Sequence, residues 1–187
     1  VSNDWLLAIE KLIAETGVAV SAARKEFVSI LNRELNYTEG VFPGARLELN
    51  GFIEDLLDIN TALDVENIFI EELFESRSLD AERGRTSKGP HRSDIIVYNL
   101  ETGLPASKCS TGEQKVLLIA IILAEARVTA SIRGGSPILL LDEVAAHLDS
   151  HHIGALFDEL KQLNSQVWVS ATHDSILDYV QSDIQKV

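Results

Sequence analysis

The sequence of 187 residues contains no methionine and a single cysteine, Cys109. One cysteine cannot form a disulfide within the chain, which favours a reducing compartment such as the cytoplasm. At ordinary amino-acid usage a chain of this length would carry a few methionines. Their absence indicates either a piece of a methionine-poor protein or a sequence that omits modified methionines.

Long apolar runs are also absent. The longest, Val116 to Ala124, is interrupted at once by Glu125 and Arg127. A membrane-spanning helix needs about 20 predominantly apolar residues. The first residues include Asn3 and Asp4 in place of the basic and apolar regions of a secretory signal peptide. The sequence therefore predicts no association with a membrane.

Basic residues are scarce. The chain has 16 Lys and Arg against 29 Asp and Glu, a formal net charge of −13. Phosphate binding depends on Lys and Arg, so the bulk charge argues against a nucleic-acid binder but does not exclude a local basic patch. The local basic cluster comprises Arg83, Arg85, Lys88 and Arg92. It is either a solvated loop or such a patch.

The first part of the sequence predicts helices. Asn3 is predicted to cap an amphipathic helix that ends at Gly17, and a second helix is predicted over about 18–36. Asp64 is predicted to cap a further helix that ends near Gly84. A mainly helical domain over 1–84 follows from this pattern.

The pattern changes near residue 85 and becomes strand, long helix, strand, helix, strand, helix. The runs "PILLLDE" and "QVWVSATHD" are short, apolar and bounded by turn residues, which is typical of strands covered on both faces. Residues 85–187 are therefore predicted to form an α/β domain with a largely parallel sheet.

Asp142 and Glu143 follow the apolar run Ile138–Leu141, at the end of a predicted strand. Ligands of open α/β sheets bind at the carboxyl ends of strands. One carboxylate there could hold Mg²⁺ through water, and the next could polarise an attacking water. Two solvated acids at the end of a buried strand explain the same residues, since short motifs match by chance.

Ser110, Thr111, Gly112 and Glu113 precede a long apolar helix. Ser110 and Glu113 have the spacing of a capping box. The same geometry leaves backbone N–H groups and the positive end of the helix dipole facing outward, which attracts phosphate. Gly112 would permit close backbone approach. A plain cap and a phosphate contact are both compatible with these residues.

Asp149 and His173 each have a structural and a functional interpretation. Asp149 could cap the helix that follows it. His173 follows an apolar strand, at the same sheet end as Asp142; it is either a surface residue or a hydrogen-bond partner of a γ-phosphate or an attacking water. For His91 and Arg92, in "GPHRSD", a tight turn is the favoured interpretation.

The order of these segments is more specific than any one of them. A signature-type turn and helix, an apolar strand ending in Asp-Glu, an A-x-L-D loop and a strand followed by His occur in this order in the C-terminal lobe of ABC-type ATPases. The segments "KGPHRSD", "CSTGEQKVLLIAIILAEAR" and "PILLLDEVAAHLD" closely resemble the RecF family of bacterial recombination-repair ATPases, which is related to the SMC-like group. The segment "LLAIEKLIAETGVAVSAARKEFVSILN" resembles the arm of that family, so the resemblance covers essentially the whole chain.

The resemblance implies a role for each motif. Ser110 to Glu113 match the signature motif, which in this family contacts the γ-phosphate of ATP bound to the opposite subunit. Asp142 matches the carboxylate that holds Mg²⁺ through water, and Glu143 matches the catalytic Glu. Ala146 to Asp149 match the loop along the dimer interface, and His173 matches the switch histidine.

Two substitutions depart from the signature of transporter ATPases. Thr111 replaces its usual glycine and Glu113 its glutamine, and both are tolerated in the RecF and SMC-like groups. Ser110 and Asp142 lie 32 positions apart (142 − 110). This separation implies a long intervening helix and a loop near Arg133, and argues against a transporter subunit.

The phosphate loop GxxxxGK(S/T) is missing: "GRTSKG" is too short, and no helix is predicted after its lysine. ABC-type ATPases carry this loop in an N-terminal lobe. The resemblance therefore implies an arm and a signature lobe from the C-terminal part of a RecF-type protein. We expect this chain alone neither to bind ATP tightly nor to hydrolyse it.

The resemblance also implies partners. They are gapped or single-strand/double-strand junction DNA, RecR-type and RecO-type mediator proteins, and a second copy joined by ATP; the implied activity aids loading of RecA. An SMC-like chromosome-organising ATPase and a non-enzymatic interaction module are the alternatives. The residues that break the N-terminal helices, Gly40, Pro43 and Gly51, argue against the very long coiled coils of the SMC group.

Overall fold

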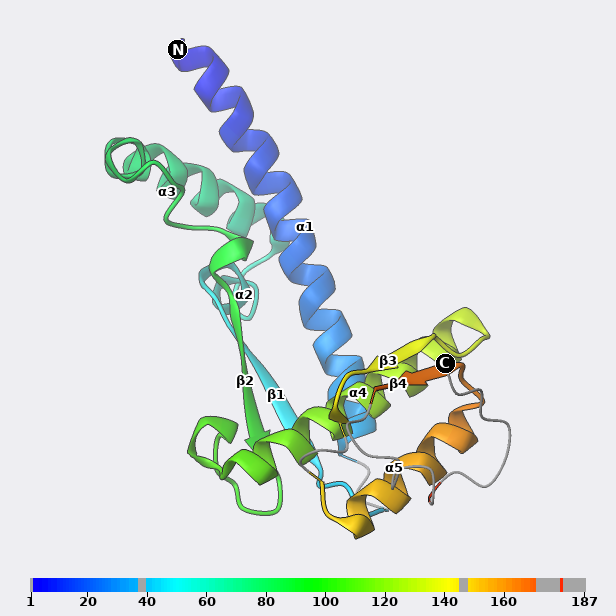
Figure 1. Cartoon of the computed structure of the whole chain (residues 1–187). Coiled ribbons are helices and arrows are strands. Elements are labelled where there is room, and N and C mark those ends of the chain that lie inside the picture. Colours follow the sequence, from blue (N-terminus) through cyan, green and yellow to red (C-terminus); the bar gives the residue numbers. More distant parts are fainter. Residues whose placement is uncertain (1, 37–39, 145–147, 171–178, 180–187) are drawn as a thin grey trace. The chain divides into compact units, whose positions relative to one another are not determined.

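The computed structural model describes residues 2–36, 40–144, 148–170 and 179. Figure 1 shows the helices and strands, coloured along the sequence. The helices are α1 (Asn3–Leu35), α2 (Phe52–Leu56), α3 (Ala62–Arg83), α4 (Thr111–Arg133) and α5 (Ser150–Leu163), with the short 3-10 turns η1 (Pro90–Arg92) and η2 (Ala106–Lys108). The strands are β1 (Ala45–Asn50), β2 (Asp94–Asn99), β3 (Leu139–Leu141) and β4 (Val167–Val169).

The strands form two small sheets, β1 with β2 and β3 with β4. Strands β3 and β4 are parallel, and Leu139, Leu140 and Leu141 pair with Val167, Trp168 and Val169 in that order. A parallel pair needs a crossover connection, and α5 provides it between these strands. The predicted α/β class with parallel pairing is confirmed, although the parallel sheet is small.

The chain divides into two compact units. The first comprises residues 1–29 and 47–96, and the second comprises residues 30–46 and 97–187. Each unit therefore contains two separate stretches of sequence. The domain boundary predicted at residue 84 stays a prediction.

Helix α1 is one continuous helix of 33 residues, so the prediction that Gly17 ends it is wrong. A Cβ at position 17 would lie 3.1 Å from Phe69 Cε1 and 3.4 Å from Pro90 Cδ. The glycine is needed for close packing against these side chains. Its helix penalty of about 1 kcal/mol is outweighed by that packing and by the helical residues on both sides.

Two predicted helix caps are also corrected. The Trp5 amide donates to Ser2 Oγ (3.3 Å), so Ser2 takes the capping position expected for Asn3. At the start of α3 the cap is Thr61, whose Oγ1 accepts from the Asp64 amide (3.3 Å). The capping oxygen thus comes from one residue before the predicted cap in α1 and from three residues before it in α3. It satisfies an N–H group of the first turn that has no partner within the helix.

The first unit is built around Phe69, which is fully buried. The buried residues around it come from α1, α2 and α3: Ala14, Val18, Ile53, Val65 and Leu73. The ring of Phe52 meets that of Phe69 edge to face at a centroid distance of 6.3 Å. Arg77 also joins α3 to α1, because its Nε and Nη2 donate to the two carboxylate oxygens of Glu10 at 2.5 and 2.7 Å.

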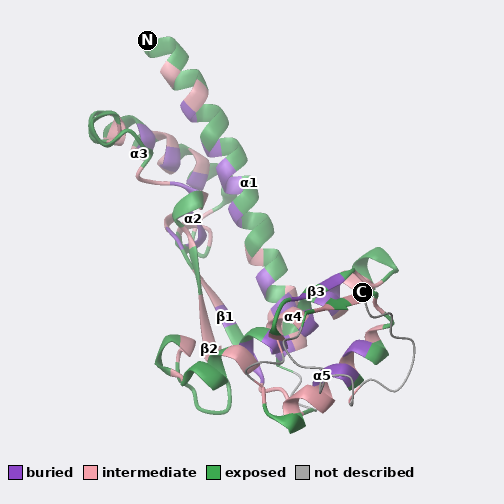
Figure 2. Ribbon diagram, in the orientation of Figure 1, coloured by how far each residue is buried: buried purple, intermediate pink, exposed green. Residues whose placement is uncertain are grey.

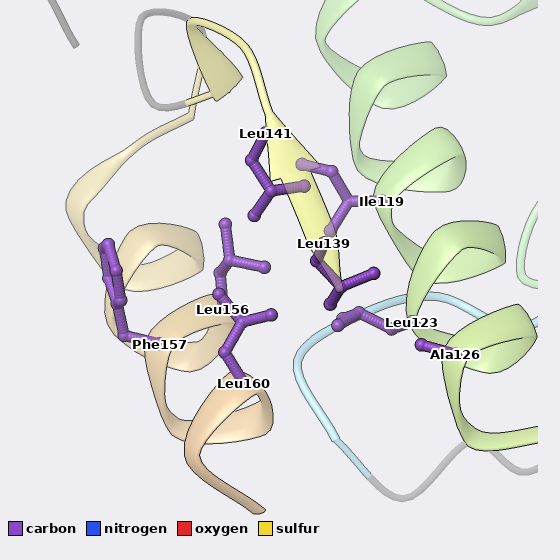
Figure 3. Close-up of a cluster of buried hydrophobic side chains, with 8 residues drawn as sticks. All are labelled: Ile119, Leu123, Ala126, Leu139, Leu141, Leu156, Phe157 and Leu160. Carbon is purple, nitrogen blue, oxygen red and sulfur yellow. The ribbon is translucent and has the colours of Figure 1, made fainter. Parts of the chain in front are cut away.

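The second unit has its core between α4, α5 and β3 (Figure 3). Its buried side chains are Ile119, Leu123, Ala126, Leu139, Leu141, Leu156, Phe157 and Leu160. In Figure 2 the buried residues of α4 and β3 appear in purple. Because side chains alternate along a strand, Leu139 and Leu141 point to the same face, toward these helices.

Among the described residues, the opposite face of the β3–β4 sheet is not covered. The cross-strand partners Leu140 and Trp168 are 76% and 53% exposed. The expectation that both faces of these strands are covered is therefore not met in the described part of the chain. One buried face is sufficient to fix the register, since a shift by one residue would expose Leu139 and Leu141.

Arg127 connects three helices within the second unit. Its Nε donates to Glu34 Oε1 at the end of α1 (2.6 Å), and its Nη1 donates to Glu159 Oε2 on α5 (2.9 Å). These residues line a small cavity of about 30 Å³ beside Phe42 and Pro43. A cavity of this size holds one water molecule, so we regard it as part of the packing.

Candidate functional site

The turn before α4 is a formed capping box. Ser110 is the N-cap residue, and its Oγ accepts from the Glu113 amide at 3.3 Å. In return Glu113 Oε2 accepts from the Ser110 amide (2.7 Å) and from Ser110 Oγ (2.6 Å). The predicted cap is confirmed.

Two backbone N–H groups at this turn remain uncommitted. Those of Thr111 and Gly112 have no hydrogen-bond partner within the described residues. A Cβ built on Gly112 would meet no atom within 4 Å. The chain's own packing therefore gives no reason for a glycine here, although glycine costs a helix about 1 kcal/mol relative to alanine.

Asp142 and Glu143 lie directly after β3, and both side chains are exposed. Glu143 has a positive φ of 46°, in the left-handed region that few residues other than glycine adopt. Its amide donates to Ser170 Oγ at 2.8 Å. Ser170 Oγ in turn donates to Asp142 Oδ1. The two acids are thus joined through one serine.

Sequence reasoning did not identify Ser170. It follows β4 directly, and its amide donates to the Leu141 carbonyl at 3.0 Å, which extends the parallel pairing by one step. The carboxyl ends of parallel strands meet at one edge of a sheet. A polar residue directly after the strand that pairs with "ILLL" was therefore the signal that could have found it.

Asp149 caps α5, as predicted. Its Oδ1 accepts from the His152 amide (2.8 Å) and lies 2.9 Å from His152 Nδ1. Of the predicted interface loop, residues 146 and 147 lie outside the described residues. The predicted switch residue His173 lies outside them too.

The predicted site residues fall into separate groups. Asp142 and Glu143 meet through Ser170, whereas Ser110 to Glu113 form a turn of their own. Within the described part of the chain, no hydrogen bond or ion pair links that turn to either acid. Contacts within this chain therefore give no reason to place one ligand between the Ser110–Glu113 turn and the two acids.

The described residues contain no group of three or more His, Cys, Asp and Glu side chains that could hold a metal ion. Asp142 Oδ2 has no hydrogen-bond partner among them, since the contact with Ser170 uses Oδ1. Mg²⁺ takes one or two protein carboxylates and completes its shell with water and substrate phosphates. The uncommitted Asp142 Oδ2 fits a Mg²⁺ site in which water and phosphates supply most of the ligands. It does not fit a site in which the protein supplies every ligand.

The segment "GPHRSD" is held to its own unit by several contacts. His91 Nε2 lies 3.0 Å from the Thr86 carbonyl, and Arg24 Nη1 donates to the Pro90 carbonyl at 2.5 Å. Ser93 Oγ donates to Glu54 Oε2 at 2.7 Å. The side chains of His91 and Arg92 are exposed. These contacts give the segment a structural role. The side chain of Arg92 takes part in none of them.

Within the described part of the chain, three carboxyl groups have a pKa below the ordinary value. Hydrogen bonds from Ser110 lower the pKa of Glu113, and the amide and ring of His152 lower that of Asp149. The hydrogen bonds of Ser87 lower the pKa of Asp80, with smaller help from Ser76. In each case the bonds favour the charged form, because a carboxylate accepts them more strongly than a neutral carboxyl.

We expect the chain to lose stability as the pH falls below about 4, near the ordinary carboxyl pKa. A group whose pKa is lowered by folding contributes stability that is complete above its unfolded pKa and is lost as the pH falls through its folded pKa. Asp149→Asn keeps a capping oxygen but cannot titrate. Its melting temperature, followed by circular dichroism, should therefore fall less between about pH 5 and pH 3 than that of the parent chain. Asp55→Asn, at an exposed acid with no hydrogen-bonded side chain among the described residues, is the control, and equal slopes for the two variants would contradict the assignment.

Comparison with known proteins places the chain in a family. The family described as "AAA domain, putative AbiEii toxin, Type IV TA system" matches residues 24–178, well over half of the sequence. The chain belongs to this AAA domain family. Within it, the chain is similar to "DNA replication and repair protein RecF" of Brucella abortus (strain 2308), with 44% identity over 188 residues. That match covers 98% of this chain and 49% of the relative.

The chain is similar to RecF proteins of other bacteria as well. Those of Rhizobium rhizogenes and Mesorhizobium japonicum are 44% and 46% identical over 170 residues, which cover 90% of this chain and 45% of each relative. The resemblance to RecF inferred from the sequence is confirmed. The chain spans about half the length of the curated relatives it matches.

Solved structures support the same fold. The chain is similar to the recombination mediator protein RecF-ATPrS in the RecFOR pathway, with a TM-score of 0.72 and 20% identity over 98% of this chain and 48% of that one. For RecF-ATP in the same pathway the TM-score is 0.68, over 94% of this chain and 48% of that one. Within the described residues, no helix of this AAA domain chain is both long and apolar enough to cross a membrane.

Proposed function

We propose that this chain is the arm and the signature-bearing lobe of a RecF-like, ATP-dependent DNA repair protein. The arm covers residues 1–84 and the lobe covers residues 85–187. One observation carries the proposal: the turn Ser110 to Glu113 is formed and presents the uncommitted N–H groups of Thr111 and Gly112. The sequence has no phosphate loop of its own to hold a nucleotide there. Such a turn fits the γ-phosphate of ATP held by another subunit.

The chemical roles follow from the positions of the residues. Asp142 would hold Mg²⁺ through water by its uncommitted Oδ2, and the ion would neutralise charge on the phosphates. Glu143 would orient the attacking water, and His173 would hydrogen-bond the γ-phosphate. Asp149 would lie in the loop along the dimer interface, where it also caps α5. ATP binding would close two copies on each other, and slow hydrolysis would separate them.

The proposed partners are gapped or junction DNA, RecR-type and RecO-type mediators and a second copy of the protein, and the proposed outcome is loading of RecA. The names of the relatives and of the two structures, which include DNA repair and the RecFOR pathway, support this proposal. With a net charge of −13, we infer that residues outside this chain supply most of the contacts to DNA phosphates.

Isothermal titration calorimetry with ATP and Mg²⁺ tests the division of labour. We expect no measurable heat of binding for this chain, because it lacks the loop and the lysine that hold the β- and γ-phosphates. The longer protein that contains it should bind ATP and hydrolyse it. Micromolar affinity of this chain alone would overturn the proposed arrangement. A longer protein that binds no ATP would favour a non-enzymatic interaction module.

A further inference from the structure

We propose that Ser170 is a positioning residue that holds Asp142 and the backbone of Glu143 in one fixed arrangement. This inference rests on the proposed function for the roles of the two acids. It goes beyond that function because no motif and no part of the resemblance assigns a role to residue 170. Three hydrogen bonds carry it.

The direction of each bond is determined by chemistry. The Glu143 amide can only donate, so Ser170 Oγ accepts from it (2.8 Å). The single hydroxyl hydrogen is then directed to Asp142 Oδ1. A hydroxyl provides the donor and the acceptor that these two groups need at once. The side chain of alanine provides neither.

The serine is itself fixed by the sheet. Its amide donates to the Leu141 carbonyl at 3.0 Å, directly after the last paired residues, Leu141 and Val169. Residue 170 therefore cannot shift along β4 without breaking the β3–β4 pairing. Through this serine, the position of Asp142 is set by the register of the sheet and not only by the end of β3.

The backbone of Glu143 gives the contact a second purpose. Its φ of 46° costs a residue other than glycine roughly 1 kcal/mol or more. Such a conformation persists only when surrounding bonds hold it. The hydrogen bond from the Glu143 amide to Ser170 Oγ is a bond of this kind, because its donor is the backbone of the strained residue itself. We infer that loss of the hydroxyl lets residue 143 relax toward negative φ and turns its carboxylate away from its present direction.

The first experiment measures the contact itself, in the chain as it stands. Amide hydrogen exchange at Glu143 should be on the order of tenfold faster in Ser170→Ala than in the parent chain. Ser170→Thr keeps the hydroxyl and should keep the parent rate. Ser165→Ala is the matched control, since the buried Ser165 Oγ has no partner within the described residues. Unchanged exchange in Ser170→Ala would overturn the inference.

The second experiment measures the consequence, in the longer protein. Ser170→Ala should lower kcat for ATP hydrolysis roughly 10- to 100-fold, as loss of a supporting hydrogen bond does at other metal-dependent sites. KM should change much less, because the nucleotide cradle is elsewhere, and Ser170→Thr should restore most of kcat. A purely structural effect would not be rescued by threonine in this selective way.

The two experiments separate the possible failures. Faster exchange with an unchanged kcat would refute the positioning role while leaving the proposed function intact. A longer protein with no ATPase activity of its own would refute the proposed function. In that case the catalytic purpose of Ser170 falls with it, and the exchange result still decides whether the contact exists.

Discussion

Glu143→Gln in the longer protein is expected to slow ATP hydrolysis by roughly 10²- to 10⁴-fold, the usual contribution of a general base. Glutamine has the shape of glutamate but cannot take a proton from water. The backbone N–H bond to Ser170 is preserved, because any residue at this position except proline provides it. ATP should therefore still bind, and the protein should accumulate as an ATP-bound dimer. Single-turnover kinetics and light scattering after size exclusion measure the two effects.

A matched substitution separates this effect from a change of charge. Glu82→Gln removes the same charge from an exposed position on α3 and should leave hydrolysis and oligomeric state unchanged. If Glu143→Gln remained monomeric with saturating ATP, the proposal that ATP lies between two subunits would be wrong. If it hydrolysed ATP at the parent rate, Glu143 would not be the catalytic residue.

Phe69→Ala is expected to destabilise the first unit by about 3–5 kcal/mol, the range for removing a large buried side chain. Phe69 is fully buried and contacts the one position on α1 where a glycine permits close approach, Gly17. Its loss would leave a cavity among the buried side chains of α1, α2 and α3. Urea denaturation followed by circular dichroism and tryptophan fluorescence measures the change.

Phe74→Ala provides the matched control for that prediction. It is the same substitution on the same helix, but Phe74 is 52% exposed. The guanidinium of Arg77 lies 4.6 Å from its ring centroid. An exposed cation–π contact contributes about 0.5–1 kcal/mol. Similar losses for Phe69→Ala and Phe74→Ala would show that the cluster around Phe69 is not the main source of stability in this unit.

The sequence predicted well those features that depend on neighbours in the chain. The capping box at Ser110 and Glu113, the cap at Asp149 and the end of α3 at Gly84 all agree with the structure. Each is decided within a few residues, by a side-chain oxygen or a glycine that satisfies the free groups of a helix end. The parallel pairing also followed from local patterns, because two short apolar runs separated by a helix favour it.

The failures have two physical causes. The sequence predicts a helix end at Gly17 because glycine is a poor helix former, but the residue that requires this glycine, Phe69, is 52 positions away (69 − 17). The sequence predicts Asn3 and Asp64 as caps because their residue types favour that position, whereas Ser2 and Thr61 directly precede the observed helices and cap them. Residue type alone does not decide between neighbouring candidates of similar propensity.

The sequence by itself determined the family, the order of the motifs and the absence of a phosphate loop, since these depend only on which residues follow one another. Tertiary structure decided that Asp142 and Glu143 are joined through Ser170, 27 positions beyond Glu143. It also decided that Leu139 and Leu141 are buried while Leu140 is exposed. These features depend on how β3 pairs with β4 and packs on α4 and α5, and hydrogen bonds and contacts between distant residues leave no periodic trace in the sequence.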